Sequence, residues 1–182
     1  MNPGLLIDND ANGGFLLGIE SIFLRLPVLE DGMAVFRLVE NCPPLDINSS
    51  YCNLLQCSHF ANTSVAALLN GELVGFISGY VVPDRPDTLF VWQVAVAEQT
   101  RGLGLGSHML THILARPHCS DITYLETTIT EDNPASWALF KRLAKALSAE
   151  FLSSGWMDNE AHFSGQHDSE ALVRIGPFNS PS

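Results

Sequence analysis

The sequence predicts a single α/β domain of the α+β type, with a mixed central sheet and helices on both of its faces. Three observations lead to this class. An Asn-Gly pair at 70–71 separates two apolar runs, which is typical of an antiparallel hairpin. A glycine-rich turn at 101–106 opens a helical pattern, and an apolar run at 122–128 follows it, so we expect one right-handed crossover between parallel strands. At 182 residues and 46% hydrophobic content, the chain fits one core.

Hydrophobic periodicity and turn residues define the N-terminal elements. Residues 21–27 alternate as a first strand, and residues 30–39 carry a helical apolar stripe that ends before Pro43-Pro44. Asn48 or Ser49 can cap a short second helix. Its apolar positions at helical spacing are Tyr51, Leu54, Leu55 and Phe60.

The rest of the chain alternates strands and helices. Residues 83–87, with the sequence PDRPD, are expected to form a loop, and Pro134 fits the first turn of a helix that is capped from 130–133. The buried stripe of that helix is expected at Ala135, Ala138, Leu139, Leu143 and Leu147. The expected strands are 63–69, 73–82, 89–97, 122–128 and 171–175, and a further helix is expected at 107–115.

Composition restricts the partners and the cellular location. We expect residues 1–20 to be a flexible leader, 21–178 the domain and 179–182 a tail. Nine Lys and Arg against twenty Asp and Glu give a formal net charge of -11, which argues against nucleic-acid and anionic-membrane partners. The apolar runs are far shorter than the roughly twenty residues of a membrane helix, and the N-terminus lacks the basic flank of a signal peptide. A cytoplasmic protein with reduced cysteines is expected.

The glycine turn at 101–106 predicts a binding site for a phosphorylated ligand, because backbone N–H groups at a helix N-terminus converge on an anion. A P-loop requires Lys and then Ser or Thr after its glycines, whereas Ser107 and His108 follow Gly106 here. The dinucleotide fingerprint fails at its third small position, which is Ser107, and it would lie mid-chain after a hairpin. An NAD-binding dehydrogenase is therefore a remote alternative.

The motif R-x-x-G-x-G at 101–106, followed by N-x-x-S-x-x-L-F at 133–140, resembles the Gcn5-related N-acetyltransferases. This resemblance implies their fold and acetyl-CoA as the co-substrate. It also implies that the strand before the turn pairs with the pantetheine arm and that the turn holds the pyrophosphate. The implied cofactor-binding residues are Val94, Ala95, Val96, Arg101, Gly102, Leu103, Gly104, Leu105, Gly106, Ser107, Asn133, Ser136 and Phe140.

A narrower resemblance covers nearly all of residues 21–178. The stretches TSVAALLNGELVGFISGYVVPDRPDTLFVWQVAV, YLETTITEDN and ALVRIGPF are similar to those of the L-2,4-diaminobutyrate acetyltransferases, which make the N4-acetyl precursor of the compatible solute ectoine. The resemblance implies acetyl transfer to the 4-amino group of L-2,4-diaminobutyrate, a role in osmoprotection and a homodimer. Another amine, such as a peptide N-terminus, is the alternative acceptor.

Transfer of an acetyl group from a thioester to an amine needs a group that takes the proton of the ammonium ion. Direct attack without a covalent enzyme intermediate is expected. A carboxylate or an ordered water can take this proton, and the candidate carboxylates are Glu126, Glu170 and Asp46. Glu126, in the middle of a strand, is named as the catalytic carboxylate, and Tyr51 can supply a hydroxyl to the substrate or simply pack its helix. Phe140 stands where many family members carry the Tyr that protonates the departing thiolate, so the general acid is left open.

The acceptor site needs negative charge, because a short diamino acid carries two ammonium groups. Asp46 and Glu170 are the residues we expect to hold these groups, and the Trp92 ring can form one wall by a cation–π contact. The polar face of the helix that starts at Pro134 carries three basic residues: Lys141, Arg142 and Lys145. They can contact a further phosphate of the nucleotide or simply be solvated.

The histidines do not predict a metal site. His108 and His112 lie four residues apart on a helix, but neither the Glu of H-E-x-x-H nor a clear third ligand accompanies them. His162, His167 and Asp168 lie in an irregular segment that we expect near the acceptor site rather than around a metal ion.

Overall fold

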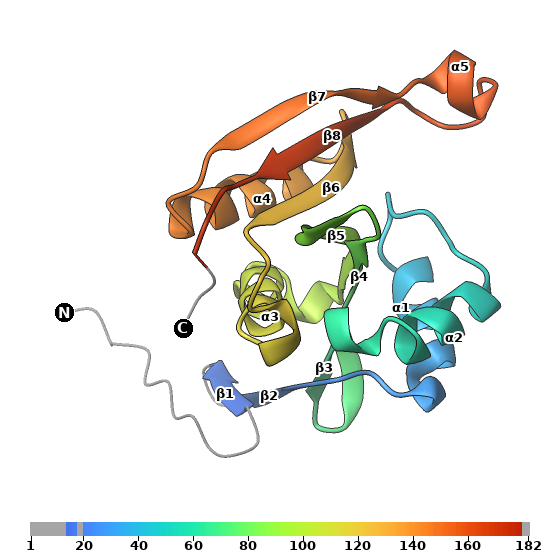
Figure 1. Cartoon of the computed structure of the whole chain (residues 1–182). Helices are drawn as coiled ribbons and strands as arrows, with labels where there is room; N and C mark the ends of the chain where they lie inside the picture. Colours follow the sequence, from blue (N-terminus) through green and yellow to red (C-terminus); the bar gives the residue numbers. More distant parts are fainter. Residues whose placement is uncertain (1–13, 18–19, 180–182) are drawn as a thin grey trace.

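The computed structural model describes residues 14–17 and 20–179, which form one eight-stranded sheet in the order β1-β2-β3-β4-β5-β6-β8-β7 (Figure 1). The strands are β1 (Gly14–Leu17), β2 (Glu20–Arg25), β3 (Val65–Leu69), β4 (Glu72–Val82), β5 (Arg85–Val96), β6 (Tyr124–Thr130), β7 (Phe151–Met157) and β8 (Glu170–Ile175). The α-helices are α1 (Gly32–Glu40), α2 (Ser50–Ser58), α3 (Leu105–Leu114), α4 (Pro134–Ala146) and α5 (Asn159–Phe163).

The sheet is mixed, as the sequence predicts. Strands β1 to β5 form an antiparallel meander, β5 and β6 are parallel, and β8 lies antiparallel between β6 and β7. Asn70 and Gly71 have φ angles of 51° and 85°, so both central residues of the β3–β4 turn are left-handed, which the two-residue hairpin requires. The β5–α3–β6 segment is the predicted crossover.

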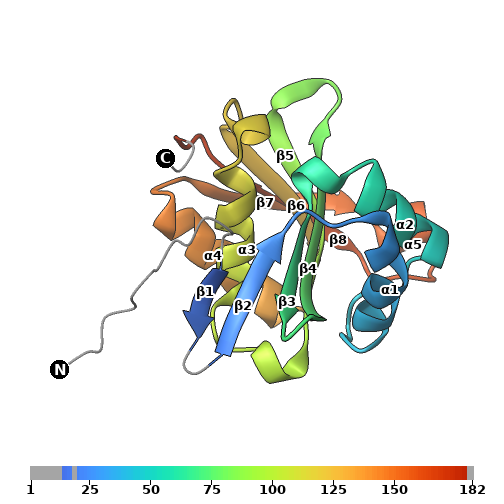
Figure 2. The same ribbon diagram turned by 90° about the horizontal axis from the view of Figure 1, so that it is seen from below.

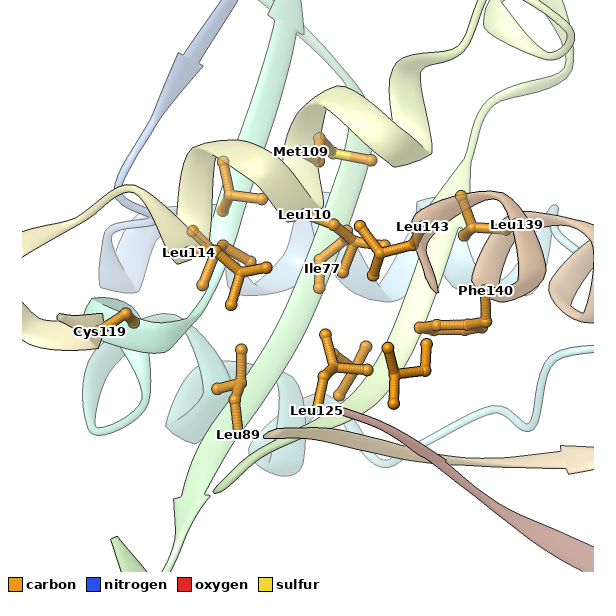
Figure 3. Close-up of a cluster of buried hydrophobic side chains, with 14 of the residues drawn as sticks. Ile77, Leu89, Met109, Leu110, Leu114, Cys119, Leu125, Leu139, Phe140 and Leu143 are labelled. Carbon is orange, nitrogen blue, oxygen red and sulfur yellow. The ribbon is translucent and has the colours of Figure 1, made fainter. Parts of the chain in front are cut away.

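Helices cover both faces of the sheet (Figures 1 and 2). Helix α3 packs against β3, β4 and β5 and contacts α4, whereas α1 and α2 pack together on the other side of β4. Figure 3 shows how apolar side chains from α3 and α4 meet those of β4, β5 and β6 in the larger core. The labelled side chains of this core are Ile77, Leu89, Met109, Leu110, Leu114, Cys119, Leu125, Leu139, Phe140 and Leu143.

Four features differ from the expected elements. Residues 14–17, within the expected leader, form β1, and the expected loop at 83–87 is a two-residue turn because β5 begins at Arg85. The buried side of α2 carries Asn53, Gln56 and Cys57 instead of the predicted apolar stripe. In α4, Leu139 and Leu143 are buried as predicted and Leu147 is half-buried, but Ala135 and Ala138 are exposed and the burial continues through Phe140 and Ala144 instead.

Strand β7 and helix α5 are not predicted by the sequence pattern. Five of the seven β7 residues are exposed, including Leu152 and Trp156, so the strand lacks the alternation that marks one buried face. Helix α5 has five residues and no buried position. Both elements nevertheless contribute to the site described below.

Within residues 14–17 and 20–179, no helix combines the length and apolar character that a membrane crossing requires. Of the four cysteines, all within the described residues and outside any disulfide bond, three are buried: Cys42, Cys57 and Cys119. The burial fits the expectation that they act mostly as small hydrophobic residues.

Candidate active site

The site begins where β5 and β6 separate. These parallel strands pair only from Thr88↔Tyr124 to Val91↔Thr127, although β5 continues to Val96 and β6 to Thr130. The Thr127 hydroxyl donates a hydrogen bond to the carbonyl of Val91 at 2.9 Å, at the last paired position. Beyond this point the β5 backbone edge that faces β6 is unpaired, and a cleft opens between the two strands.

A β-bulge lies at the same point on the other edge of β5. The β4–β5 register changes from Ser78↔Gln93 to Gly79↔Val91, so Trp92 is an extra residue without a partner. A bulge turns the following side chains relative to the rest of the strand. Here Trp92 is 43% exposed, whereas Gln93 is 7% exposed, and both line the cleft.

One half of the cleft is a cavity of about 560 Å³ at the N-terminus of α3. Gly102 and Gly104 have φ angles of 77° and 81°, a conformation that side-chain-bearing residues rarely adopt. A Cβ atom on Gly106 would lie 3.3 Å from the Leu139 side chain, so this glycine permits α3 to pack closely on α4. The turn therefore exposes the free N–H groups of the first turn of α3 beside the cavity.

Most of the predicted cofactor residues line this cavity. The cationic side chains at its wall are Arg101, whose Nε donates to the Val96 carbonyl at 3.1 Å, and Arg142 on α4. The N-cap residue Asn133 accepts a hydrogen bond from the Ser136 N–H at 3.1 Å. The predicted residues that line the cavity are Val94, Val96, Arg101, Gly102, Gly104, Leu105, Gly106, Ser107, Asn133 and Ser136.

Three predicted cofactor residues are placed differently. Ala95 is fully buried and packs into the cluster with α1, because alternation along β5 turns it away from Val94 and Val96. Leu103 is 46% exposed and is not among the lining residues of either cavity. Phe140 lines the second cavity and not this one.

The second half of the cleft is a cavity of about 420 Å³. It is continuous with the first, since Pro44, Leu45, Val94, Asn133 and Ser136 line both. Its other walls come from the α1–α2 loop, the ends of β6 and β7, α5 and the start of β8. The predicted substrate residues Asp46, Trp92 and Glu170 all line it, together with His167.

Three titratable side chains converge in this second cavity. The His167 Nε2 atom lies 2.8 Å from Asp46 Oδ2, and its Nδ1 lies 2.7 Å from the Asp168 carbonyl oxygen. One polar atom from each of Asp46, His167 and Glu170 lies within 4.8 Å of the others. These three side chains are therefore close enough to hold one small cation between them.

The pKa shifts in this cluster have different causes. Burial raises the pKa of the Glu170 carboxyl, whose Oε2 is buried without a hydrogen-bond partner among the described residues. The hydrogen bond to the Asp168 carbonyl, followed by that to Asp46, raises the pKa of His167. An imidazolium can donate from both ring nitrogens, which fits both contacts.

Aromatic rings form the remaining wall. The Trp92 and Tyr80 rings are nearly perpendicular, at 85° with centroids 6.4 Å apart, and Tyr80 also stacks on Phe90 at 5.2 Å. Trp156 on β7 contacts the Phe90 ring edge-on at 6.3 Å. The cavity thus combines an aromatic wall with two carboxylates.

Two predicted catalytic residues lie away from both cavities. Glu126 is buried between Arg85 and Arg174, with its Oε2 accepting from Arg85 Nη2 at 2.7 Å and its Oε1 bonded to both guanidiniums. Despite burial, these hydrogen bonds lower the pKa of Glu126. Tyr51 is 67% exposed on α2, and neither residue is among the cavity-lining residues.

The other histidines named in the sequence analysis have different surroundings. His112 is half-buried, its Nδ1 lies 3.2 Å from Arg116 Nη2, and burial lowers its pKa. His162 accepts a hydrogen bond from the Asp158 N–H at 2.7 Å on the exposed helix α5. Of the segment expected near the acceptor site, His167 lines the cavity, while His162 and Asp168 do not.

A comparison with known protein families identifies the family of the chain that forms this cleft. Residues 33–144 match the acetyltransferase (GNAT) family, a segment of more than half the chain that includes the bulge, the glycine turn and Asn133. The chain belongs to the GNAT acetyltransferase family. A doubly wound dehydrogenase sheet is not supported, because the described GNAT sheet contains a single parallel pair.

Relatives within the family have names that specify the substrate. This GNAT chain is 57% identical over 159 residues to the L-2,4-diaminobutyric acid acetyltransferase of Methylotuvimicrobium alcaliphilum, covering 87% of this chain and 92% of that protein. It is 46% identical over 160 residues to the enzyme of the same name from Halomonas elongata, with 87% and 83% covered. These relatives confirm the narrower resemblance.

Solved structures agree with the fold. Diaminobutyrate acetyltransferase EctA from Paenibacillus lautus, in complex with its substrate L-2,4-diaminobutyric acid and coenzyme A, superposes with a TM-score of 0.83 at 37% identity, covering 88% of this chain and 98% of that chain. Ard1 from Thermoplasma volcanium has a TM-score of 0.69 at 17% identity, with 85% and 97% covered, and shares the fold.

Sequence reasoning missed part of the wall of the second cavity. Gln93, Asn48 and Trp156 line the second cavity but were not among the predicted site residues. Gln93 follows Trp92 in a strand whose alternation would place it on the opposite face. The bulge that overrides this alternation leaves no recognisable signal in a single sequence.

Proposed function

We propose that this enzyme transfers the acetyl group of acetyl-CoA to the 4-amino group of L-2,4-diaminobutyrate. The observation that carries this proposal is the grouping of Asp46, His167 and Glu170 at one end of a cleft whose other end is a phosphate-binding turn. The diaminobutyric acid acetyltransferases to which the chain is similar support it.

The two halves of the cleft suit the two substrates by charge. Arg101, Arg142 and the N-terminus of α3 attract the phosphates of acetyl-CoA. The β5 edge that β6 leaves unpaired can pair with its extended arm, which brings the thioester to the shared wall at Asn133 and Ser136. The carboxylates of Asp46 and Glu170 attract the ammonium groups of the acceptor.

Glu170, and not Glu126, is the base in this proposal. Burial raises the pKa of Glu170, which makes its carboxylate a better proton acceptor, and one of its oxygens has no partner among the described residues. Both oxygens of Glu126 are occupied by guanidiniums that lower its pKa. Glu126 instead holds β5, β6 and β8 together.

The reaction then balances without an enzyme intermediate. Glu170 takes a proton from the acceptor ammonium, and the neutral nitrogen attacks the thioester carbonyl carbon. The C–S bond breaks, and the second proton that the nitrogen loses as the amide forms is balanced by the one that the leaving thiolate gains. Phe140 lacks a hydroxyl group, so the proton for the thiolate comes from water, from the proton released by the amine or from another hydroxyl; Ser136 lines the cleft at this position.

The test is to mix the protein with acetyl-CoA and L-2,4-diaminobutyrate, follow thiol release and locate the acetyl group by NMR. We expect rapid release and acetylation at N4. Tight acetyl-CoA binding without release would contradict the proposed acceptor. A parallel assay with a peptide N-terminus as the acceptor tests the alternative substrate, and we expect no release there.

The biological setting follows from this product. We propose a cytoplasmic enzyme that supplies the N4-acetyl precursor for ectoine and so serves osmoprotection; the relatives named for the same reaction support this role. In a cell that makes ectoine, disruption of the gene is expected to abolish ectoine and growth at high salt. Normal ectoine levels in the disrupted strain would contradict the assignment.

We also propose a homodimer. Strand β7 is an edge strand of the described sheet, and Leu152 and Trp156 on it are 52% and 46% exposed. Unpaired strand edges with apolar side chains favour association. Light scattering should give twice the 19.8 kDa chain mass, and Leu152→Lys should shift it toward the monomer. A monomeric wild-type protein would contradict the proposal.

A further inference from the structure

We infer that Gln93 is a positioning residue that clamps the α1–α2 loop and thereby places the Asp46 carboxylate at the acceptor site. The inference deepens the proposed function and rests on it. It concerns residues 41–49, the connection between α1 and α2. Gln93 acts on the substrate only through this loop.

The hydrogen bonds of the loop define the clamp. The Gln93 Nε2 donates to the Asp46 carbonyl oxygen at 2.9 Å, and its Oε1 accepts from Asn48 Nδ2 at 3.2 Å. Only one orientation of the amide satisfies both partners, because a carbonyl oxygen can only accept and an amide nitrogen can only donate. The two hydrogen bonds therefore hold the residues on either side of Ile47, which are Asp46 and Asn48.

Little else holds this part of the loop. Ile47 is 60% exposed, and the Asp46 side chain is 69% exposed. Among the described residues, the hydrogen bonds of residues 46–48 run to Gln93 and to His167. His167 belongs to the opposite wall of the cavity, and the side chain of Leu45, before Asp46, makes only apolar contacts with the cluster under α1. Gln93 is therefore the hydrogen-bonding anchor that fixes Asp46 relative to β5.

The burial of Gln93 makes the clamp rigid. The side chain is 7% exposed and projects from β5 beside the bulge, on a strand whose β4 pairing extends on both sides of it. A buried amide with both of its polar atoms paired is held in one rotamer, whereas an exposed side chain with few partners is not. Because Gln93 has a fixed position on β5, its hydrogen bonds also fix the position of the Asp46 carboxylate on the loop.

The variant Gln93→Met removes both hydrogen bonds at similar volume. We expect the KM for L-2,4-diaminobutyrate to rise about tenfold, with the KM for acetyl-CoA within twofold of wild type. Asn48→Ala, which removes one bond at a half-buried position, should raise the diaminobutyrate KM about threefold. Gln56→Met is the matched control, since Gln56 is equally buried on α2 but lines neither cavity.

A double-mutant cycle separates positioning from a general packing effect. If Gln93 acts through Asp46, then Gln93→Met causes no further rise in the diaminobutyrate KM when Asp46 is already alanine. An additive rise, or an unchanged diaminobutyrate KM in both Gln93→Met and Asn48→Ala, would overturn the inference and leave the proposed function intact.

Backbone ¹⁵N relaxation tests the clamp independently of the substrate. In the ligand-free enzyme, the order parameters of the backbone amides of residues 46–48 should be lower in Gln93→Met than in wild type, with those of the α3 amides unchanged. Unchanged order parameters at 46–48 would overturn the clamp even for an active enzyme. If wild-type protein does not acetylate diaminobutyrate, the proposed function fails, and the relaxation experiment still decides whether Gln93 holds the loop.

Discussion

The two cavities of the cleft are built in opposite ways. The cavity of about 560 Å³, which we propose holds acetyl-CoA and call the cofactor cavity, centres on a continuous turn at 101–106, where positive φ angles and a helix N-terminus create an anion site from the backbone itself. The cavity of about 420 Å³, which we propose holds the amine and call the acceptor cavity, is assembled from side chains on the α1–α2 loop, β5, β6, β7, α5 and β8. The first is therefore sensitive to backbone conformation, and the second to individual charged groups and to the loops that carry them.

The largest expected effect concerns the acceptor cavity. Glu170→Gln retains the shape of the side chain but removes the proton acceptor, so kcat should fall about 100-fold or more while the KM for acetyl-CoA stays near wild type. Steady-state kinetics with both substrates checks this. Asp168→Asn is the control, because Asp168 is an exposed carboxylate on the same segment and lines neither cavity. An active Glu170→Gln enzyme would exclude Glu170 as the base.

A second variant tests whether Glu126 belongs to either cavity. Glu126→Gln leaves two partly exposed guanidiniums without a charged partner, and because water can solvate them, the loss should be about 2 kcal/mol of unfolding free energy. Thermal unfolding should show a melting temperature lower by roughly 4–8 °C, since about 1 kcal/mol corresponds to 2–4 °C at this chain length. The kcat of the folded variant should remain near wild type. Loss of kcat at an unchanged melting temperature would return Glu126 to a catalytic role.

Backbone conformation is the corresponding test of the cofactor cavity. Gly104→Ala places a side chain at a φ of 81°, which costs about 1–2 kcal/mol and disturbs the anion site, so the KM for acetyl-CoA should rise about tenfold. Gly71→Ala introduces the same strain at a φ of 85° in the β3–β4 turn, far from the cleft in sequence. It should lower stability similarly without changing either KM. Equal KM values for the two variants would contradict a special role of the glycine turn.

The smallest expected effect is a change in the titration of His167. Its pKa is raised by the Asp168 carbonyl and by Asp46, so Asp46→Asn should lower the pKa measured by histidine NMR. Because the folded-state pKa lies above the ordinary value, the contact stabilises the fold below that ordinary value. The contribution fades as the pH rises through the raised pKa. A pKa of His167 unchanged in Asp46→Asn would show that the two side chains do not interact in solution.

The contrast between the cavities explains how far the sequence could predict them. The hairpin at Asn70-Gly71, the crossover helix and the glycine turn depend on local residue preferences, and the structure confirms all three. Of the predicted cofactor residues, Ala95, Leu103 and Phe140 do not line this cavity. Strand alternation explains Ala95, whose side chain lies on the opposite face of β5 from Val94 and Val96.

The acceptor cavity was predictable only in part, because its residues meet through tertiary structure. Asp46, Trp92 and Glu170 line this cavity, as the sequence predicted, whereas Glu126 does not. The arginine partners of Glu126 come from β5 and β8, far apart in the sequence, so a single sequence does not reveal that its carboxylate is already paired. Gln93 was missed because the β-bulge at Trp92 places the Gln93 side chain on the opposite face of the sheet from the one that strict alternation predicts. Strand β7 was missed because neither of its faces is uniformly buried.

The most direct test of the account is the pair of KM values of Asp46→Ala. Removal of a charge-assisted contact predicts a KM for L-2,4-diaminobutyrate about tenfold or more above wild type, with the KM for acetyl-CoA unchanged. That result would show that the acceptor cavity around Asp46 binds the amine separately from the cofactor cavity. An unchanged diaminobutyrate KM, or equal rises for both substrates, would contradict the division of the cleft into two cavities.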